Sequence, residues 1–282
     1  MDHFALSVMF ISVLGFAGSA LSQDFRVVAV DEAPGRTMNA ETFPSANPDA
    51  LKKYMPDGTA PASMSSFVLF AGDDIILIDT GLGTEVWTGK LTELGIQPEQ
   101  IKLILITHFH GDHIGGLLDN ANVRRFPHAR VFSAEPEYNF WLLRERQPQG
   151  ALFGRIRAAY GEDLATFKFE DEVFANSSVK IKALDASGHT PGHTVFLIES
   201  TQSGGQRLLI IGDLLHAAAL QFPVPEACAR FDMDPEKSVA SRRRILDFAV
   251  AQNLPIAGMH FPPPSVGTVK KEGNGYAFEL KE

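Results

Sequence analysis

Residues 107–116 have the sequence Thr-His-Phe-His-Gly-Asp-His-Ile-Gly-Gly, which places three imidazoles and one carboxylate within six positions. His108 and His110 are two residues apart, so on extended backbone their side chains point the same way and can bind one cation as neutral imidazoles. Asp112 and His113 follow within one short turn and are placed for a second cation nearby. A single histidine usually packs in a core or on a surface, but four ligand-type side chains this close together predict a metal site.

An apolar run, Ile-Lys-Leu-Ile-Leu-Ile at residues 101–106, precedes the histidine segment. A short run rich in Ile and Leu and bounded by turn-forming residues is typical of a buried strand. The histidine segment would then be the loop that leaves the carboxyl end of this strand, where open α/β sheets place their binding sites. Gly115 and Gly116 would let backbone and helix approach each other closely.

The pattern His-Xaa-His-Xaa-Asp-His after a hydrophobic strand resembles the signature of the metallo-β-lactamase-fold hydrolases. Residues 187–194, 212–213 and 259–260 each follow a predicted strand and match the family's later metal motifs in order and context. The resemblance covers most of the chain after residue 22. It implies a single α/β domain over residues 23–282, an αββα sandwich of two mixed β-sheets packed face to face with helices outside.

The resemblance also implies ligands for two divalent metal ions per chain. One ion would be held by His108, His110 and His189, the other by Asp112, His113 and His260, with Asp213 bridging them. Imidazole and carboxylate ligands without cysteine suit zinc, although manganese, cobalt or iron would also be accepted because ligand type discriminates weakly among these metals.

Three residues are expected to have roles around the metals. Asp79 ends a predicted strand in the sequence Asp-Thr-Gly, and in this family that aspartate usually orients the metal loop without being a ligand. His193, in the same Gly-His-Thr-Pro-Gly-His stretch as His189, is likewise expected to support ligands instead of binding metal. Asp112 would also take a proton from the attacking water while serving as a ligand.

The rest of the chain predicts strands alternating with helices. Helical spacing predicts helices over residues 82–94, 135–147, 151–165 and 237–252, with another opening at 114–118. Strands are predicted at residues 25–30, 65–70, 74–79, 129–133, 179–184, 194–199, 207–212 and 256–259. The proline-rich residues 31–61 predict a loop with a short helix near 51–54. Arg242, Arg243 and Arg244 are expected on a solvated helix face.

Residues 1–22 differ from the rest of the chain. The apolar run over residues 4–17 is too short for a secure membrane span and is followed by small residues. This pattern predicts a secretory signal cleaved near Ala20 or Ser22, although Asp2 stands where Lys or Arg is usual; a buried N-terminal helix is the alternative. The mature protein would then be periplasmic or secreted, without stable membrane insertion.

Composition limits the function classes. The chain has 282 residues, of which 45% are hydrophobic and 21% charged, typical of a soluble globular protein with a substantial core. The formal net charge of −9 argues against a nucleic-acid partner, which normally requires a basic face. Cys228 is the only cysteine, so an intrachain disulfide is excluded. Because relatives are often dimers, a homodimer is expected.

The ligand set predicts metal-assisted hydrolysis of a small molecule. A bound metal lowers the pKa of water from about 16 toward about 7, which supplies a metal-bound hydroxide at neutral pH. The second ion would polarise the carbonyl or phosphoryl oxygen of the substrate and stabilise the leaving alkoxide. The Gly-Xaa-Ser-Xaa-Gly motif of serine hydrolases is absent from the sequence.

Within the superfamily, the chain most resembles methyl-parathion-hydrolase-like enzymes and the related lactonases and aryl esterases. The likeness is carried by residues 188–194, 212–215, 218–222, 237–240, 260–262 and 273–278. In that branch aromatic side chains wall the substrate pocket, which implies Trp87, Trp141, Phe153 and Phe231 here, with ordinary core packing as the alternative for each.

His216 bears on the choice of substrate. It stands three residues after Asp213, where related lactonases carry a tyrosine that polarises the carbonyl or protonates the leaving oxygen, and an imidazole can do similar work. Lactones or aryl carboxylic esters are therefore expected as substrates, and phosphotriesters are the alternative. A β-lactamase is less favoured. Glyoxalase II is also less favoured, because it would need a further C-terminal helical domain. A non-catalytic module is less favoured because it would be expected to have lost ligands.

Overall fold

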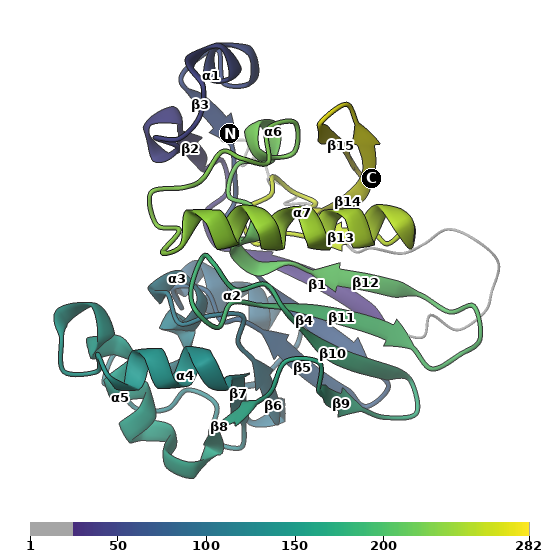
Figure 1. The fold of residues 1–282 in the computed structure, drawn as a ribbon. Coiled ribbons are helices and arrows are strands. Elements are labelled where there is room, and N and C mark those ends of the chain that lie inside the picture. Colours follow the sequence, from purple (N-terminus) through teal and green to yellow (C-terminus); the bar gives the residue numbers. More distant parts are fainter. Residues whose placement is uncertain (1–24, 282) are drawn as a thin grey trace, which may run out of the picture.

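Two β-sheets form the centre of the computed structural model, which describes residues 25–281 (Figure 1). The sheets pack face to face and helices cover their outer faces. The predicted αββα sandwich is thereby confirmed. The predicted signal peptide at residues 1–22 lies outside the described residues.

The first sheet has six strands in the order β1-β4-β5-β6-β7-β8. They are β1 (Arg26–Asp31), β4 (Ser65–Ala71), β5 (Asp74–Ile78), β6 (Leu103–Leu105), β7 (Arg130–Ala134) and β8 (Leu164–Phe167). Neighbouring strands from β5 to β8 are parallel, so their carboxyl ends lie at one edge of the sheet. The histidine segment leaves β6 at this edge.

The second sheet has seven strands in the order β15-β14-β13-β12-β11-β10-β9. They are β9 (Glu172–Ala175), β10 (Val179–Asp185), β11 (Thr194–Ser200), β12 (Arg207–Ile210), β13 (Ile256–Ala257), β14 (Val266–Glu272) and β15 (Gly275–Leu280). Only β12 and β13 are parallel among the neighbours of this sheet within the described residues. Two short strands, β2 (Thr37–Asn39) and β3 (Thr59–Pro61), form a separate pair.

Helices cover the outer face of each sheet (Figure 1). The α-helices of the described residues are α1 (Pro48–Tyr54), α2 (Glu85–Glu93), α3 (Gly111–Ile114), α4 (Glu135–Leu142), α5 (Ala151–Tyr160), α6 (Ala218–Gln221) and α7 (Pro235–Ala251), of which α1 packs against α6 and the β2–β3 pair. Trp87 of α2, Trp141 of α4 and Ile156 of α5 pack on the first sheet. Ile245 and Leu246 of α7 pack on the second sheet.

The largest apolar layer lies between the two sheets. Side chains that alternate along strands of both sheets fill it, including Phe67, Ile78 and Leu105 from the first sheet and Phe196 and Ile210 from the second. All five are fully buried. Because side chains on a strand alternate between faces, one sequence pattern supplies both this layer and the layer beneath the helices. The two sheets are thus held in fixed relation, with their strand ends near one another.

Several predicted elements need correction. The histidine segment is not all loop, because α3 already begins at Gly111, and residues 115–117 form a 3₁₀ turn instead of opening a longer helix. Helix α5 ends at Tyr160, where Gly161 adopts a φ of 55° that terminates helices, and the chain continues into the unpredicted strand β8. Strands β2, β3, β9, β14 and β15 were also missed by the sequence patterns.

The predicted solvated face for three arginines is wrong for Arg242. Its side chain is fully buried beneath α7, and its guanidinium donates to the carbonyl oxygens of Leu214, Pro225 and Ala227. It also forms an ion pair with Asp232 at 3.4 Å. Burial of an arginine is tolerated only when its donors find acceptors, and here they do.

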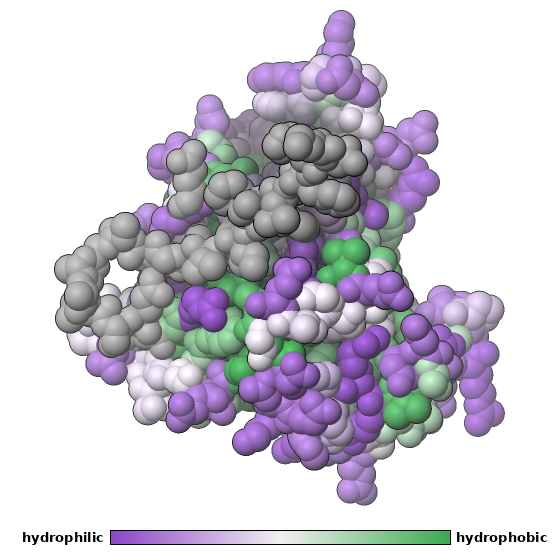
Figure 2. Space-filling view, turned by 180° about the vertical axis from the view of Figure 1, so that it is seen from behind, coloured by the Kyte–Doolittle hydropathy of each residue, from purple (hydrophilic) through white to green (hydrophobic). Residues whose placement is uncertain are grey.

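The surface is mostly polar on the face opposite to that of Figure 1. Figure 2 shows hydrophilic side chains predominating there, with apolar side chains in separate patches. Across residues 25–281, none of the helices has the length and apolar content that crossing a membrane requires.

Candidate metal centre

Seven ligand-type side chains from the segments that follow four strands meet at one place. His108 and His110 follow β6, while Asp112 and His113 lie on the short helix α3 directly after them. The other three each follow a strand of the second sheet: His189 after β10, Asp213 after β12 and His260 after β13. Both sheets therefore contribute to the site, and the structure brings together all seven predicted ligands.

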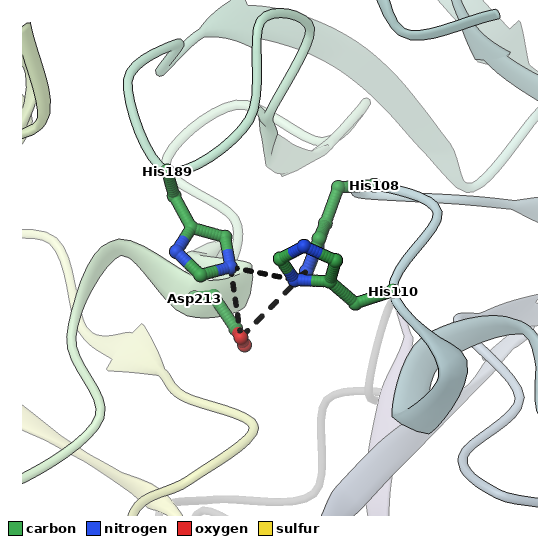
Figure 3. Close-up of side chains that lie close together, drawn as sticks. All are labelled: His108, His110, His189 and Asp213. Atoms are coloured by element: carbon green, nitrogen blue, oxygen red, sulfur yellow. Dashed lines mark hydrogen bonds and ion pairs between the residues drawn. The ribbon is translucent and has the colours of Figure 1, made fainter. Parts of the chain in front are cut away.

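Three imidazoles, which we call the histidine group, form one half of the site: His108, His110 and His189. The Nδ1 atom of His110 lies 3.0 Å from Nε2 of His108 and 3.0 Å from Nε2 of His189 (Figure 3). Asp213 Oδ2 faces the group, at 3.3 Å from His189 Nε2 and 3.6 Å from His108 Nε2. These four atoms surround one point.

The aspartate group, formed by Asp112, His113 and His260, is the other half. Asp213 Oδ1 lies 3.0 Å from Nε2 of His113 and 3.1 Å from Nε2 of His260. The Asp112 carboxylate is 3.9 Å from His113 Nε2 and 3.7 Å from His260 Nε2. Each oxygen of Asp213 therefore faces a different group, which is the arrangement of a bridging carboxylate.

The donor atoms fit divalent metal ions. Tetrahedral ligands at the usual zinc–nitrogen distance lie about 3.3 Å from one another, and the separations within each group scatter around that value. His113 Nε2 and Asp213 Oδ1 are buried and, although 3.0 Å apart, neither makes a hydrogen bond of acceptable geometry. Buried polar atoms are rarely left without a partner, so these two are explained best as metal ligands.

Electrostatics favour cations at the same place. Burial opposes the charge on Asp213, but the surrounding imidazoles outweigh it and hold the pKa of its carboxyl well below the usual range. Burial also lowers the pKa of His189, yet hydrogen bonds to Asp213 and Asp232 raise it to about 9. The carboxylates therefore draw a proton onto His189, and a divalent cation can supply the same compensating charge while releasing that proton.

The histidine group is held by contacts behind its rings. His189 donates from Nδ1 to the buried carboxylate of Asp232 at 2.8 Å. His108 Nδ1 lies 3.0 Å from the hydroxyl of Thr107, which donates onward to Asp79. Partners of this kind fix the tautomer and the orientation of a metal-binding imidazole.

The aspartate group is held differently. His113 donates from Nδ1 to Asp79 at 2.7 Å, and His260 donates from Nδ1 to the backbone carbonyl of Ser63 at 3.0 Å. Asp79 also accepts from the backbone N–H and the hydroxyl of Thr107. It adopts a φ of 58°, in the left-handed region that aspartate tolerates better than most residues. These contacts match the orienting role predicted for Asp79.

His193 has both ring nitrogens occupied. Its Nδ1 donates to the carbonyl of Ala186 at 3.2 Å, and its Nε2 accepts from the backbone N–H of Asp213 at 2.9 Å. Burial and the nearby His189 lower the pKa of His193 to about 3. A neutral ring held in this way positions Asp213 and has no nitrogen left for a metal, as the supporting role requires.

His216 is buried beside the bridging carboxylate. Its Nε2 lies 3.1 Å from Asp213 Oδ2, and its ring stacks at 5.3 Å from that of His260. Burial lowers the pKa of His216, while Asp213 opposes that shift. An uncharged imidazole next to both ligand groups can donate a hydrogen bond to an oxygen bound there.

Two of the four predicted pocket aromatics lie at the site. The Trp141 ring is 5.9 Å from that of His110, and the Phe231 ring is 5.2 Å from that of His216. Trp141 lines a cavity of about 400 Å³ together with Phe140, Leu152 and Met233. Phe231 is 40% exposed, so it is free to contact a ligand.

The pocket assignment of Trp87 and Phe153 is corrected. Trp87 is fully buried, packs edge-on against Phe126 and donates from Nε1 to Ser66. Phe153 is buried behind Phe109, at 4.8 Å between ring centroids. Helical spacing puts both side chains on the faces of α2 and α5 that cover the first sheet.

Sequence reasoning missed two buried carboxylates near the ligands. Asp232 holds His189, and Glu137 accepts four hydrogen bonds around the metal-binding loops. Burial raises the pKa of Glu137, and these donors oppose the shift. Neither residue belongs to a spacing pattern, and an acidic residue in a predicted helix or loop usually lies on the surface. No signal in the sequence distinguishes them.

A family model described as the metallo-beta-lactamase superfamily matches residues 60–251. An atrochrysone carboxyl ACP thioesterase of Pseudocercospora fijiensis (strain CIRAD86) is 30% identical over 138 residues, 48% of this chain and 33% of that protein. The lactamase-like protein nscB of Trichophyton equinum (strain ATCC MYA-4606 / CBS 127.97) is 25% identical over 190 residues, 65% of this chain and 47% of that protein. The matches thus span between a third and about half of these curated relatives.

Solved structures are similar over nearly the whole chain. AidC, a dizinc quorum-quenching lactonase, superposes with a TM-score of 0.80 and 24% identity, covering 92% of this chain and 95% of its own. The hydrolase AbOPH, of the beta lactamase superfamily, superposes with a TM-score of 0.78 and 26% identity, covering 93% and 97%. At 24% identity, the superposition with AidC shows that the two chains share a fold.

Proposed function

The chain belongs to the metallo-beta-lactamase superfamily, and from that premise we propose that it uses two divalent metal ions, preferably zinc, to hydrolyse lactones or aryl carboxylic esters. The observation that carries the proposal is the Asp213 carboxylate, which turns one oxygen to the histidine group and the other to the aspartate group. A pair of ions held this way activates water and polarises a substrate oxygen.

Asp112 is the carboxylate best placed for proton transfer. It exposes 27% of its side chain, whereas Asp213 exposes 4%. A carboxylate that reaches both the aspartate group and solvent can accept a proton from the attacking water and pass it on. This role is compatible with Asp112 also serving as a metal ligand.

His216 supports the preference for carboxylic substrates. Its ring lies beside the shared carboxylate and is held uncharged by burial. A neutral imidazole N–H can donate to the carbonyl oxygen or to the leaving alkoxide as negative charge develops there. Lactones and aryl esters both generate such an oxygen.

The walls of the site suit an apolar acyl or aryl group. Trp141, Leu152 and Met233 line the cavity of about 400 Å³ that adjoins His110, and Arg144 and Gln149 are polar groups in its wall. A cavity of this size and lining is typical of small-molecule sites, with few polar groups to fix orientation. Phe231 stands at the exposed side, next to His216.

The test is steady-state kinetics of metal-reconstituted protein on a lactone, an aryl ester, a thioester and a phosphotriester. We expect the highest kcat/KM on the lactone or the aryl ester. The variant His216→Phe is expected to lower kcat on both by about 10²-fold, as for loss of one oxyanion donor, while the metal content stays unchanged. A phosphotriester that reacts faster than both carboxylic substrates would overturn the proposed substrate class.

A further inference from the structure

Glu137 is a fully buried carboxylate on α4 with all of its acceptor capacity in use. Its Oε1 accepts from the backbone N–H of Phe109 at 2.9 Å and from Nε1 of Trp141 at 2.7 Å. Its Oε2 accepts from the hydroxyl of Thr190 at 2.7 Å and from the backbone N–H of Gly192 at 2.9 Å. A carboxylate offers about four lone-pair sites, and all four are filled.

Three of the four donors belong to the two loops that carry the histidine group. Phe109 lies between His108 and His110, so its N–H fixes the backbone from which both rings project. Thr190 and Gly192 follow His189 in the next loop. One side chain thus connects segments that are far apart in sequence and that must stay in register for three imidazoles to share an ion.

The close approach of α4 to the second loop is independent support. A Cβ atom placed on Gly192 would lie 2.2 Å from the backbone nitrogen of Glu137 and 2.6 Å from its Cα. Only glycine fits at this distance, so the loop is pressed against the first turn of α4. The contact is part of the packing and does not depend on how the Glu137 side chain is oriented.

We propose that Glu137 is a positioning residue that holds the two loops of the histidine group at metal-binding separation. The inference rests on the proposed function, because it concerns the affinity of one of the two ions assumed there. None of the four donors to Glu137 is a ligand side chain of that group. It acts through both loops, and its bonds to Thr190 and Gly192 lie on the His189 loop, which carries no residue of the aspartate group.

Substitution of Glu137 by glutamine makes a selective test. An amide presents one acceptor oxygen and one donor nitrogen, so it cannot accept four hydrogen bonds. The Thr190 hydroxyl can rotate to accept, whereas the N–H of Phe109 and the N–H of Gly192 cannot. The Phe109 side also holds the Trp141 N–H, so the amide oxygen will take that side and the amide nitrogen will face Thr190 and Gly192. The Gly192 N–H then loses its acceptor, which weakens the tie to the His189 loop and preserves the tie to Phe109.

The experiment is competition between a chromophoric chelator and the zinc-loaded full chain, which measures the affinity of each ion without substrate. For Glu137→Gln we expect the affinity of one ion to fall by about 10–100-fold, the usual effect of losing a partner behind a ligand, while the other is unchanged. Excess zinc should restore kcat. Ile156→Val is the matched control, since it trims a buried side chain of the same helical layer and removes none of the hydrogen bonds of Glu137.

Two outcomes separate the proposals. If wild-type protein binds two ions and Glu137→Gln retains both with unchanged affinity, or loses both in parallel with Ile156→Val, the positioning role is overturned and the hydrolase proposal stands. If wild-type protein binds none, the proposed function itself fails.

Should Glu137→Gln not fold, Thr190→Val is the second variant, because it removes a single donor to Glu137. We expect it to lower the affinity for the same ion by a smaller factor. Affinities equal to those of wild-type protein would overturn the positioning role.

Discussion

The two ligand groups face the same carboxylate, yet they are supported to different degrees. In the histidine group, His189 donates to buried Asp232, and Glu137 ties together the backbone of both loops. In the aspartate group, His260 rests on a backbone carbonyl and Asp112 exposes 27% of its side chain. More of the first group is therefore fixed before any ion binds.

This difference predicts unequal ions. A preorganised group of buried imidazoles loses less conformational entropy on binding than a group with a partly exposed carboxylate. We therefore expect the ion at the histidine group to be held more tightly and the ion at the aspartate group to leave first when a chelator is added. The variants below either remove this inequality or enlarge it.

Asp213→Ala should have the largest effect because it removes a ligand from both groups at once. We expect both ions to be weakened and kcat/KM to fall by more than the roughly 100-fold typical of outer partners. Metal analysis after gel filtration measures the first effect, and kinetics the second. A variant that lost only one ion would contradict the bridging role.

Arg242→Ala should destabilise the support of the histidine group. It removes the guanidinium that pairs with the buried carboxylate of Asp232, and breaking such a pair usually lowers the free energy of unfolding by about 3–5 kcal/mol. Arg243 is the matched control, since it is 31% exposed and pairs with Glu226 at the surface, where a pair contributes about 0–1 kcal/mol. Urea unfolding of the two alanine variants measures the contrast, and equal losses would argue against it.

Asp79→Asn should act mainly on the aspartate group. Asparagine tolerates the left-handed backbone at this position, so the substitution tests the hydrogen bonds to His113 and Thr107 without added strain. We expect the weaker ion to lose about 10-fold in affinity, toward the low end for such partners, and the inequality to grow. Chelator competition is again the measurement. If the tighter ion were the one affected, the assignment of Asp79 to the aspartate group would be wrong.

The sequence identified the seven side chains that the structure brings together because they lie in the segments that follow strands. Parallel strands bring their carboxyl ends to one edge, so His108, His110 and Asp112 needed only local spacing to be found. His189, Asp213 and His260 were found by resemblance to a family whose motifs keep the same order. The layers of the fold followed from the apolar runs and from helical spacing.

The support behind the ligands could not be predicted, because it depends on contacts between distant segments. Glu137 and Gly192 are 55 positions apart, and His189 and Asp232 are 43 apart. Arg242 lies among charged residues on α7. Helical spacing alone could not predict that its side chain donates to buried carbonyl groups. The same limit explains the wrong assignment of Trp87 to the pocket, because an aromatic residue type alone does not show whether the side chain faces the sheet or the pocket.

X-ray absorption spectroscopy of the zinc-reconstituted protein tests the central claim most directly. The account predicts two zinc ions per chain, with nitrogen and oxygen neighbours at about 2.0–2.2 Å and a metal–metal separation of about 3.5–4 Å. A single ion per chain, or two ions with no metal–metal scattering at that distance, would contradict it.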